Sequence, residues 1–226
     1  MKKYILFLFA LIFFNTLSFV RVEGSSNKPL EKKDYIIFID VNELTLSLID
    51  KKTKKSEKIY PIAIGKKETP SPLGQWKITS KALKEGPFGG YWLGLNAPWD
   101  TFGIHGTSNP SSIGSLASNG CIRMYNYNIK EVFYLVDYDT EVIIQGGPTW
   151  RLSPYVRIIK PKDKGTDVFY VQKALKDLGY YTGVIDGIYG YPLEIAVTQY
   201  REEHNLSGDS KIDEIFLNSI GLPKFE

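Results

Sequence analysis

The period of the hydrophobic pattern changes along this 226-residue chain. Up to about residue 147, short apolar or alternating runs are separated by glycine and proline, which predicts strands. After about residue 164, apolar side chains recur at three- and four-residue intervals, as on one face of a helix. The two patterns predict a mainly β domain, a barrel or sandwich with a short helix, followed by a small three-helix bundle. We expect the β domain over 34–145, a linker over 146–164 and the bundle over 165–222.

The expected strands differ in how they are buried. Residues 35–39 form a continuous apolar run, as in a strand buried on both faces, whereas 44–48 alternate apolar and polar side chains. One helix is expected over 129–136, with Asn126 or Asn128 as its N-cap. The remaining expected strands are 58–64, 75–79, 91–95, 102–105 and 141–144.

Capping signals divide the second half into three helices. Thr166 or Asp167 is the expected start of the first helix, which Gly179 ends. The second helix begins near Pro192, because proline suits the first helical position. Asp213 caps the third, short helix, and Gly221 stops it.

The N-terminus has the pattern of an export signal. Lys2 and Lys3 precede an apolar stretch over 4–20, and 1–24 is expected to be a signal peptide. An uncleaved membrane anchor is the alternative, and only then would the protein touch the membrane. Both interpretations place the bulk of the chain outside the cytoplasm.

One cysteine is present, and its surroundings suggest a nucleophile. Cys121 follows a glycine, lies sixteen residues after His105 and precedes Arg123 by two. A reactive thiol needs a base or a positive field, which His105 and Arg123 can supply. In an oxidising compartment a single cysteine cannot form an internal disulfide, so it is a reactive group or a partner for another chain. The alternative is a small buried hydrophobic side chain.

Charge and ligand composition exclude other classes of function. Removing 1–24 lowers the net charge from +3 to +1, which gives no support for nucleic-acid binding. Two histidines in different predicted domains and one cysteine do not make a metal-ligand set. We therefore expect neither a metal nor a cofactor.

Both halves resemble known families. Residues 34–145 resemble the YkuD-type L,D-transpeptidase catalytic domain through 69–74, 104–107, the sixteen-residue spacing and 118–124. Asn119 stands where that family commonly has a second histidine, and the resemblance assigns the base to His105. Residues 163–222 are similar to a three-helix peptidoglycan-binding module through segments such as 165–168, 178–180 and 186–190. The alternative for this half is a bundle that only packs on the first domain.

These resemblances imply a cell-wall enzyme. Cys121 would attack a peptidoglycan stem peptide and form a thioester, with His105 as the base. The resemblance implies that the carbonyl of Gly106 holds the other imidazole nitrogen. An L,D-carboxypeptidase, which uses water as acceptor, and a non-catalytic wall-binding protein are the alternative functions.

Several neighbouring residues receive supporting roles. The main-chain N–H groups of Gly120 and Cys121 are the expected donors to the oxyanion. Ser118 and Asn119, in the same segment, also belong to the expected substrate site. Arg123 would lower the thiol pKa or hold a substrate carboxylate, and a structural ion pair is its alternative. Tyr91 and Trp92 are candidates for a lid over the site, or parts of a packed hairpin.

Overall fold

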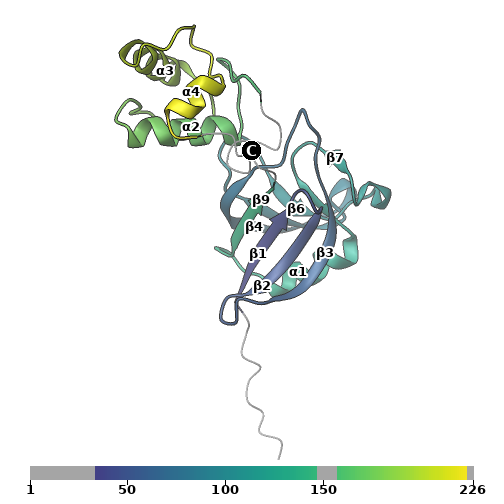
Figure 1. Ribbon diagram of the computed structural model, residues 1–226. Helices are drawn as coiled ribbons and strands as arrows, with labels where there is room; N and C mark the ends of the chain where they lie inside the picture. The colour runs from purple at the N-terminus through teal and green to yellow at the C-terminus, as the bar shows by residue number, and fades with distance from the viewer. Residues whose placement is uncertain (1–33, 147–156, 223–226) are drawn as a thin grey trace, which may run out of the picture. The chain divides into compact units, whose positions relative to one another are not determined.

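The computed structural model describes residues 34–146 and 157–222, and the predicted signal peptide lies outside them. Nine strands form one sheet in the order β2-β1-β9-β4-β5-β6-β8-β3-β7 (Figure 1). An additional pairing of β2 with β3 closes eight of the nine strands into a barrel, with β7 added alongside β3. The strands are β1 (Tyr35–Asp40), β2 (Thr45–Asp50), β3 (Ser56–Gly65), β4 (Gly74–Lys84), β5 (Gly90–Leu95), β6 (Gly103–His105), β7 (Leu116–Ser118), β8 (Ile122–Met124) and β9 (Glu141–Gln145).

Alternating side chains of the strands fill the barrel. In β1, Ile37 and Ile39 are fully buried, whereas Ile36 and Phe38 are half-buried. The expectation that this strand is equally buried on both faces is therefore wrong, because only one face points into the barrel core. Most neighbouring strands are antiparallel, but β1 with β9 and β6 with β8 are parallel pairs.

Helix α1 (Asn126–Leu135) lies after β8 in the chain, and its apolar side packs on the core through Ile129 and Val132. The expected caps are wrong: Tyr125 is the N-cap residue and makes no side-chain capping bond. Asn126 instead accepts a hydrogen bond from the Thr107 N–H at 2.7 Å. This bond ties the start of the helix to the loop that follows β6.

The C-terminal segment contains α2 (Thr166–Asp177), α3 (Tyr191–Glu203) and α4 (Glu214–Ser219). Asp213 caps α4 by accepting from the Phe216 N–H at 2.9 Å, and Pro192 lies in the first turn of α3, as the sequence predicts. Helix α2 starts at Thr166, one of the two expected residues, and Gly165 is its N-cap residue. Together the helices enclose their own apolar core.

Residues 157–164, assigned to the linker on sequence grounds, are part of this helical unit. Ile159 is 1% exposed and pairs with Ile212 in a β-bridge. Arg157 donates to the Asp167 carboxylate at 2.8 Å. The ordered structure around the helices thus begins earlier than their periodicity indicates.

Aromatic contacts connect α2 with the barrel. Phe169 packs edge-on against Trp76, with ring centroids 5.5 Å apart, and lies 5.9 Å from Trp99. The Thr166 hydroxyl donates to the carbonyl of Leu73, just before β4. Within the described ranges, no helix has both the length and the apolar character that crossing a membrane requires.

Candidate active site

Three consecutive strands of the barrel, β5, β6 and β8, carry or adjoin most of the candidate residues. Trp92 on β5 is opposite His105 on β6, and His105 is opposite Arg123 on the parallel strand β8. Cys121 directly precedes β8. In this parallel register Cys121, which precedes Ile122, falls beside Gly103, so the cysteine and the histidine lie on neighbouring strands with an offset of two residues.

The imidazole of His105 is fixed in one orientation. Its Nδ1 lies 2.5 Å from the Gly106 carbonyl oxygen, which can only accept a hydrogen bond, so Nδ1 carries the proton. Trp92 stacks on the ring at a centroid distance of 5.6 Å, and Phe88 meets it edge-on at 5.1 Å. Nε2 is left as the nitrogen that can accept a proton.

Burial determines the protonation state of this base. Burial, together with the charges of Arg123 and Lys84, lowers the pKa of His105 to about 4, and the Gly106 hydrogen bond opposes the shift. The side chain is 5% exposed. At neutral pH the imidazole is therefore uncharged and able to accept a proton.

The thiol of Cys121 is half-buried, and its sulfur lies 3.9 Å from the Thr101 carbonyl oxygen. Burial raises the pKa of this thiol, an effect opposed by a backbone hydrogen bond from Gly103 and by the charge of Arg123. Both partners are thus neutral at rest. A proton has to leave the sulfur as a carbon–sulfur bond forms, which is general-base catalysis rather than attack by a preformed thiolate.

A tight turn presents the cysteine. Ser118 is 1% exposed; its hydroxyl accepts from the Gly120 N–H at 3.0 Å and donates to the Cys121 carbonyl at 2.6 Å. The φ angle of Gly120 is +112°, and a Cβ there would lie 2.7 Å from a ring carbon of Phe102. Because the turn itself uses the Gly120 N–H, the Cys121 N–H is the remaining one of the two expected oxyanion donors.

Arg123 is half-buried on β8 and forms no ion pair with any residue in the described ranges. The structural ion pair considered for it has no partner there.

The two lid candidates lie in the antiparallel β4–β5 hairpin. Trp92 is 4% exposed, and Tyr91 packs against Phe133 of α1. Their positions correspond to the packed-hairpin alternative, with Trp92 forming a wall of the site. Phe88, in the short 3-10 helix η1 (Gly86–Phe88) just before this hairpin strand, contacts both Trp92 and His105.

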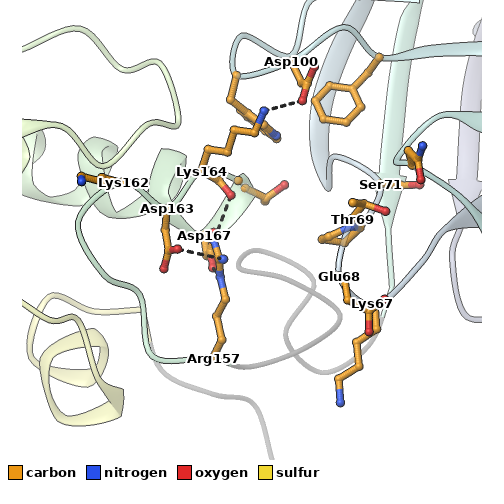
Figure 2. Close-up of a pocket in the computed structure, with 16 residues that line it drawn as sticks. Lys67, Glu68, Thr69, Ser71, Asp100, Arg157, Lys162, Asp163, Lys164 and Asp167 are labelled. Atoms are coloured by element: carbon orange, nitrogen blue, oxygen red, sulfur yellow. Dashed lines mark hydrogen bonds and ion pairs between the residues drawn. The ribbon is translucent and has the colours of Figure 1, made fainter.

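A pocket of about 570 Å³ adjoins the cysteine turn (Figure 2). Asn119 is exposed and forms part of its wall, together with Phe102 and the segment 67–71. Thr69 in that segment donates to the Ser118 carbonyl at 3.2 Å. Charged residues of 157–167, which the sequence analysis did not single out, line another part of the pocket, and Lys164 bonds Asp100 at 2.6 Å. The pocket extends the candidate site beyond the predicted residues.

The second histidine lies far along the chain at the end of α3, where His204 stacks on Tyr200. In the part of the chain that the structure describes, no cluster of three or more His, Cys, Asp or Glu side chains could hold a metal ion.

Sequence comparisons match both halves of the chain to known families. The family described as "L,D-transpeptidase catalytic domain" (YkuD) matches residues 34–144. The family described as "Putative peptidoglycan binding domain" matches residues 164–220.

Individual relatives carry names of the same kind. The chain is 43% identical over 111 residues to "Putative L,D-transpeptidase YkuD" of Bacillus licheniformis. The aligned region covers 49% of this chain and only 65% of that relative. It is 33% identical over 132 residues to "Putative L,D-transpeptidase YqjB" of Bacillus subtilis, covering 51% of this chain and 73% of that one. The NMR structure of the catalytic domain from the E. faecium L,D-transpeptidase is 25% identical, with a TM-score of 0.43, and covers 50% of this chain and 98% of that chain.

Proposed function

This chain belongs to the YkuD-type L,D-transpeptidase family, and on that premise we propose that it is an active cysteine acyltransferase of the bacterial cell wall. Its substrate would be a peptidoglycan stem tetrapeptide, in which an amide joins a diamino acid to a terminal D-alanine. The C-terminal helices would bind the wall itself. Because the stem peptides and the wall both lie outside the cytoplasm, this function requires export of the chain.

The observation that carries the proposal is the fixed tautomer of His105 beside the strand that Cys121 directly precedes. Nδ1 donates to the Gly106 carbonyl, so Nε2 is free to take the thiol proton. The sulfur then attacks the stem carbonyl, and the Cys121 N–H is a candidate donor to the oxyanion.

The intermediate collapses by breaking the amide bond. The carbonyl carbon keeps the sulfur as a thioester, and the imidazolium returns its proton to the nitrogen of the departing D-alanine. An amine from a second stem then attacks the thioester, releasing the thiol and forming a cross-link. If water attacks instead, the reaction is a carboxypeptidase reaction with the same acyl-enzyme.

Mass spectrometry of the protein with a tetrapeptide muropeptide tests the covalent step. We expect an adduct on Cys121 with loss of one D-alanine, and a cross-linked product when an amine acceptor is added. Cys121→Ala, which changes little volume, should keep the fold and form no adduct. An adduct on Cys121→Ala, or none on the wild type, would overturn the proposal; trimmed stems without cross-links would assign the carboxypeptidase.

The base is tested with a matched pair of histidine variants. His105→Gln should lower the rate of adduct formation by about 10²- to 10⁴-fold, the usual contribution of general acid–base catalysis. His204→Gln is the control, because His204 lies in the helical unit, where it stacks on Tyr200 and meets Tyr180 edge-on. Loss of activity in the control alone would show that the site has been misplaced.

A further inference from the structure

A second cation lies beside His105 that the mechanism above does not use. Lys84 ends β4, and its Nζ lies 4.2 Å from the ring centroid of Trp92 and 5.1 Å from that of Phe88. The same two rings pack directly on His105. The same pair of aromatic side chains therefore contacts both this ammonium and the base.

Strand pairing places Lys84 on the same side of the sheet as the active site. Ala82 is opposite Trp92, and Lys84, two residues further along β4, points to the same face as Ala82. Trp92 is in turn opposite His105, and His105 is opposite Arg123. Side chains directly opposite on neighbouring strands share a face, and Lys84 shares the face of Ala82. We call Lys84, Trp92, His105 and Arg123 the active-site row.

The two cations of the active-site row have no anionic partner among the residues that the structure describes. Lys84 and Arg123 are both half-buried, and neither forms an ion pair with any residue in the described part of the chain. The aromatic faces under Lys84 stabilise its charge only partly. A partly desolvated cation without a counter-ion favours an anion from the substrate.

The order of the strands decides which anion each cation faces. Cys121 leads into β8, so the acyl part of the substrate is attached on the Arg123 side of His105. His105 protonates the leaving amine, so the departing residue lies against the imidazole. Lys84 lies on the other side of His105, beyond Trp92. The carboxylate of the departing residue is attached one carbon from the leaving nitrogen, which brings it within reach of that side.

We propose that Lys84, held over Phe88 and Trp92, is the binding site for the C-terminal carboxylate of the D-amino acid that leaves. This inference rests on the proposed function and names a substrate group for it. The subsite selects stems that end at the departing residue, because any further residue would replace the carboxylate by an uncharged amide.

Two donors that differ only at the C-terminus test the subsite: a tetrapeptide stem ending in D-alanine and the same stem ending in D-alaninamide. We expect the wild type to form the acyl adduct about 10- to 100-fold faster (kcat/KM) with the carboxylate, from the usual strength of a charge-assisted hydrogen bond. Lys84→Gln should lose this preference by slowing only the carboxylate donor. Lys84→Arg should keep the preference, which excludes misfolding as the cause.

Lys77→Gln is the matched control. Lys77 lies on the same strand, but its ammonium pairs with Asp139, so the preference should stay at the wild-type level. A Lys84→Gln variant that keeps the preference, or slows both donors equally, would overturn the subsite while the Cys121 adduct still forms. Absence of any adduct on the wild type with either donor would instead overturn the proposed function.

Discussion

At the scale of single residues, the site depends on burial as much as on the identity of the reacting groups. His105 and Cys121 are both shifted toward their neutral forms by burial, although Arg123 and Lys84 are cations. Those cations act in the same direction as burial on the histidine and in the opposite direction on the cysteine. The pair is therefore poised for proton transfer during attack, with little charge separated beforehand.

The lowered pKa of His105 predicts the acid limb of the pH profile. The base works only when unprotonated, and with a pKa of about 4 it stays unprotonated as the pH falls from 7 to about 5. The kcat/KM for adduct formation should be flat over that interval and decrease as the pH passes through about 4. An acid limb near the ordinary value of 6.5 would contradict this prediction.

Phe88→Ala provides a companion variant for this profile. Removing a ring that covers His105 lets water reach the imidazole, so the acid limb should move up toward 6.5. Phe88→Leu keeps most of the covering volume and should shift the limb less.

Gly120 is the residue whose replacement should do most damage for its size. Its φ of +112° is unfavourable for a side chain, and an added Cβ would also meet Phe102 at 2.7 Å. Gly120→Ala should lower the free energy of unfolding by more than the roughly 1–3 kcal/mol that such backbone strain costs, and should abolish adduct formation. Gly114→Ala is the control: its φ is +86°, but no heavy atom lies within 4 Å of the added Cβ. Equal losses of stability, measured by urea unfolding, would exclude the clash.

At the scale of elements, the long strands could be predicted from the sequence, but two short ones could not. The expected strands at 75–79 and 91–95 overlap β4 and β5, because alternating apolar side chains mark the first and a short apolar run marks the second. β7 and β8 have three residues each, which is too few to show a periodic pattern. This region is interpreted from the motif around Cys121 and not from strand periodicity. Pairing between strands is likewise invisible in a local pattern, so the position of Lys84 beside the site could not be foreseen.

Asn126 lies at the start of the helix, as the sequence indicates, but its side chain bonds a partner outside the helix. The sequence pattern indicates a helix start, where asparagine usually caps its own helix. Here its carbonyl oxygen accepts from Thr107, and it also fills the space next to Gly89 and Gly106, where added Cβ atoms would lie 2.1 and 2.5 Å from it. The side chain of Asn126 therefore forms a long-range hydrogen bond instead of a local helix cap.

Replacing Asn126 should therefore affect the base through the loop that holds it. Asn126→Ala leaves the buried Thr107 N–H without its acceptor, at a cost of about 1–3 kcal/mol in the free energy of unfolding. The Gly106 carbonyl that holds His105 belongs to the same peptide group as the Thr107 N–H, so adduct formation should slow as well. Asn126→Asp retains an acceptor oxygen and should recover most of the stability in thermal unfolding; an Asp variant as weak as the Ala variant would contradict this role.

At the scale of the whole molecule, the two matched families divide the proposed work. All residues assigned to the chemistry lie in the segment 84–123, whereas the helical unit contributes none of them. Removing the helices should leave the rate on soluble muropeptides within a few-fold of the full chain. On intact sacculi the truncated protein should need a higher concentration, because a wall-binding unit raises the local enzyme concentration.

Assays of the full chain and of residues 33–146 on both substrates measure this difference. The helical unit alone, residues 157–226, should sediment with insoluble peptidoglycan. Loss of activity on the soluble substrate would show that the helices complete the active site. Lys164 would then act through its ion pair with Asp100, and Phe169 through its ring contact with Trp99.

The stacking of Trp92 on His105 gives the enzyme an optical reporter of its own chemistry. An indole emits brightly beside a neutral imidazole and is quenched by an imidazolium, so the fluorescence of this one tryptophan should follow the proton on the base. In a protein whose other three tryptophans, Trp76, Trp99 and Trp150, are replaced by phenylalanine, the emission should dim as the acid limb is crossed. Under rapid mixing with donor, a transient dip would time the arrival of the thiol proton.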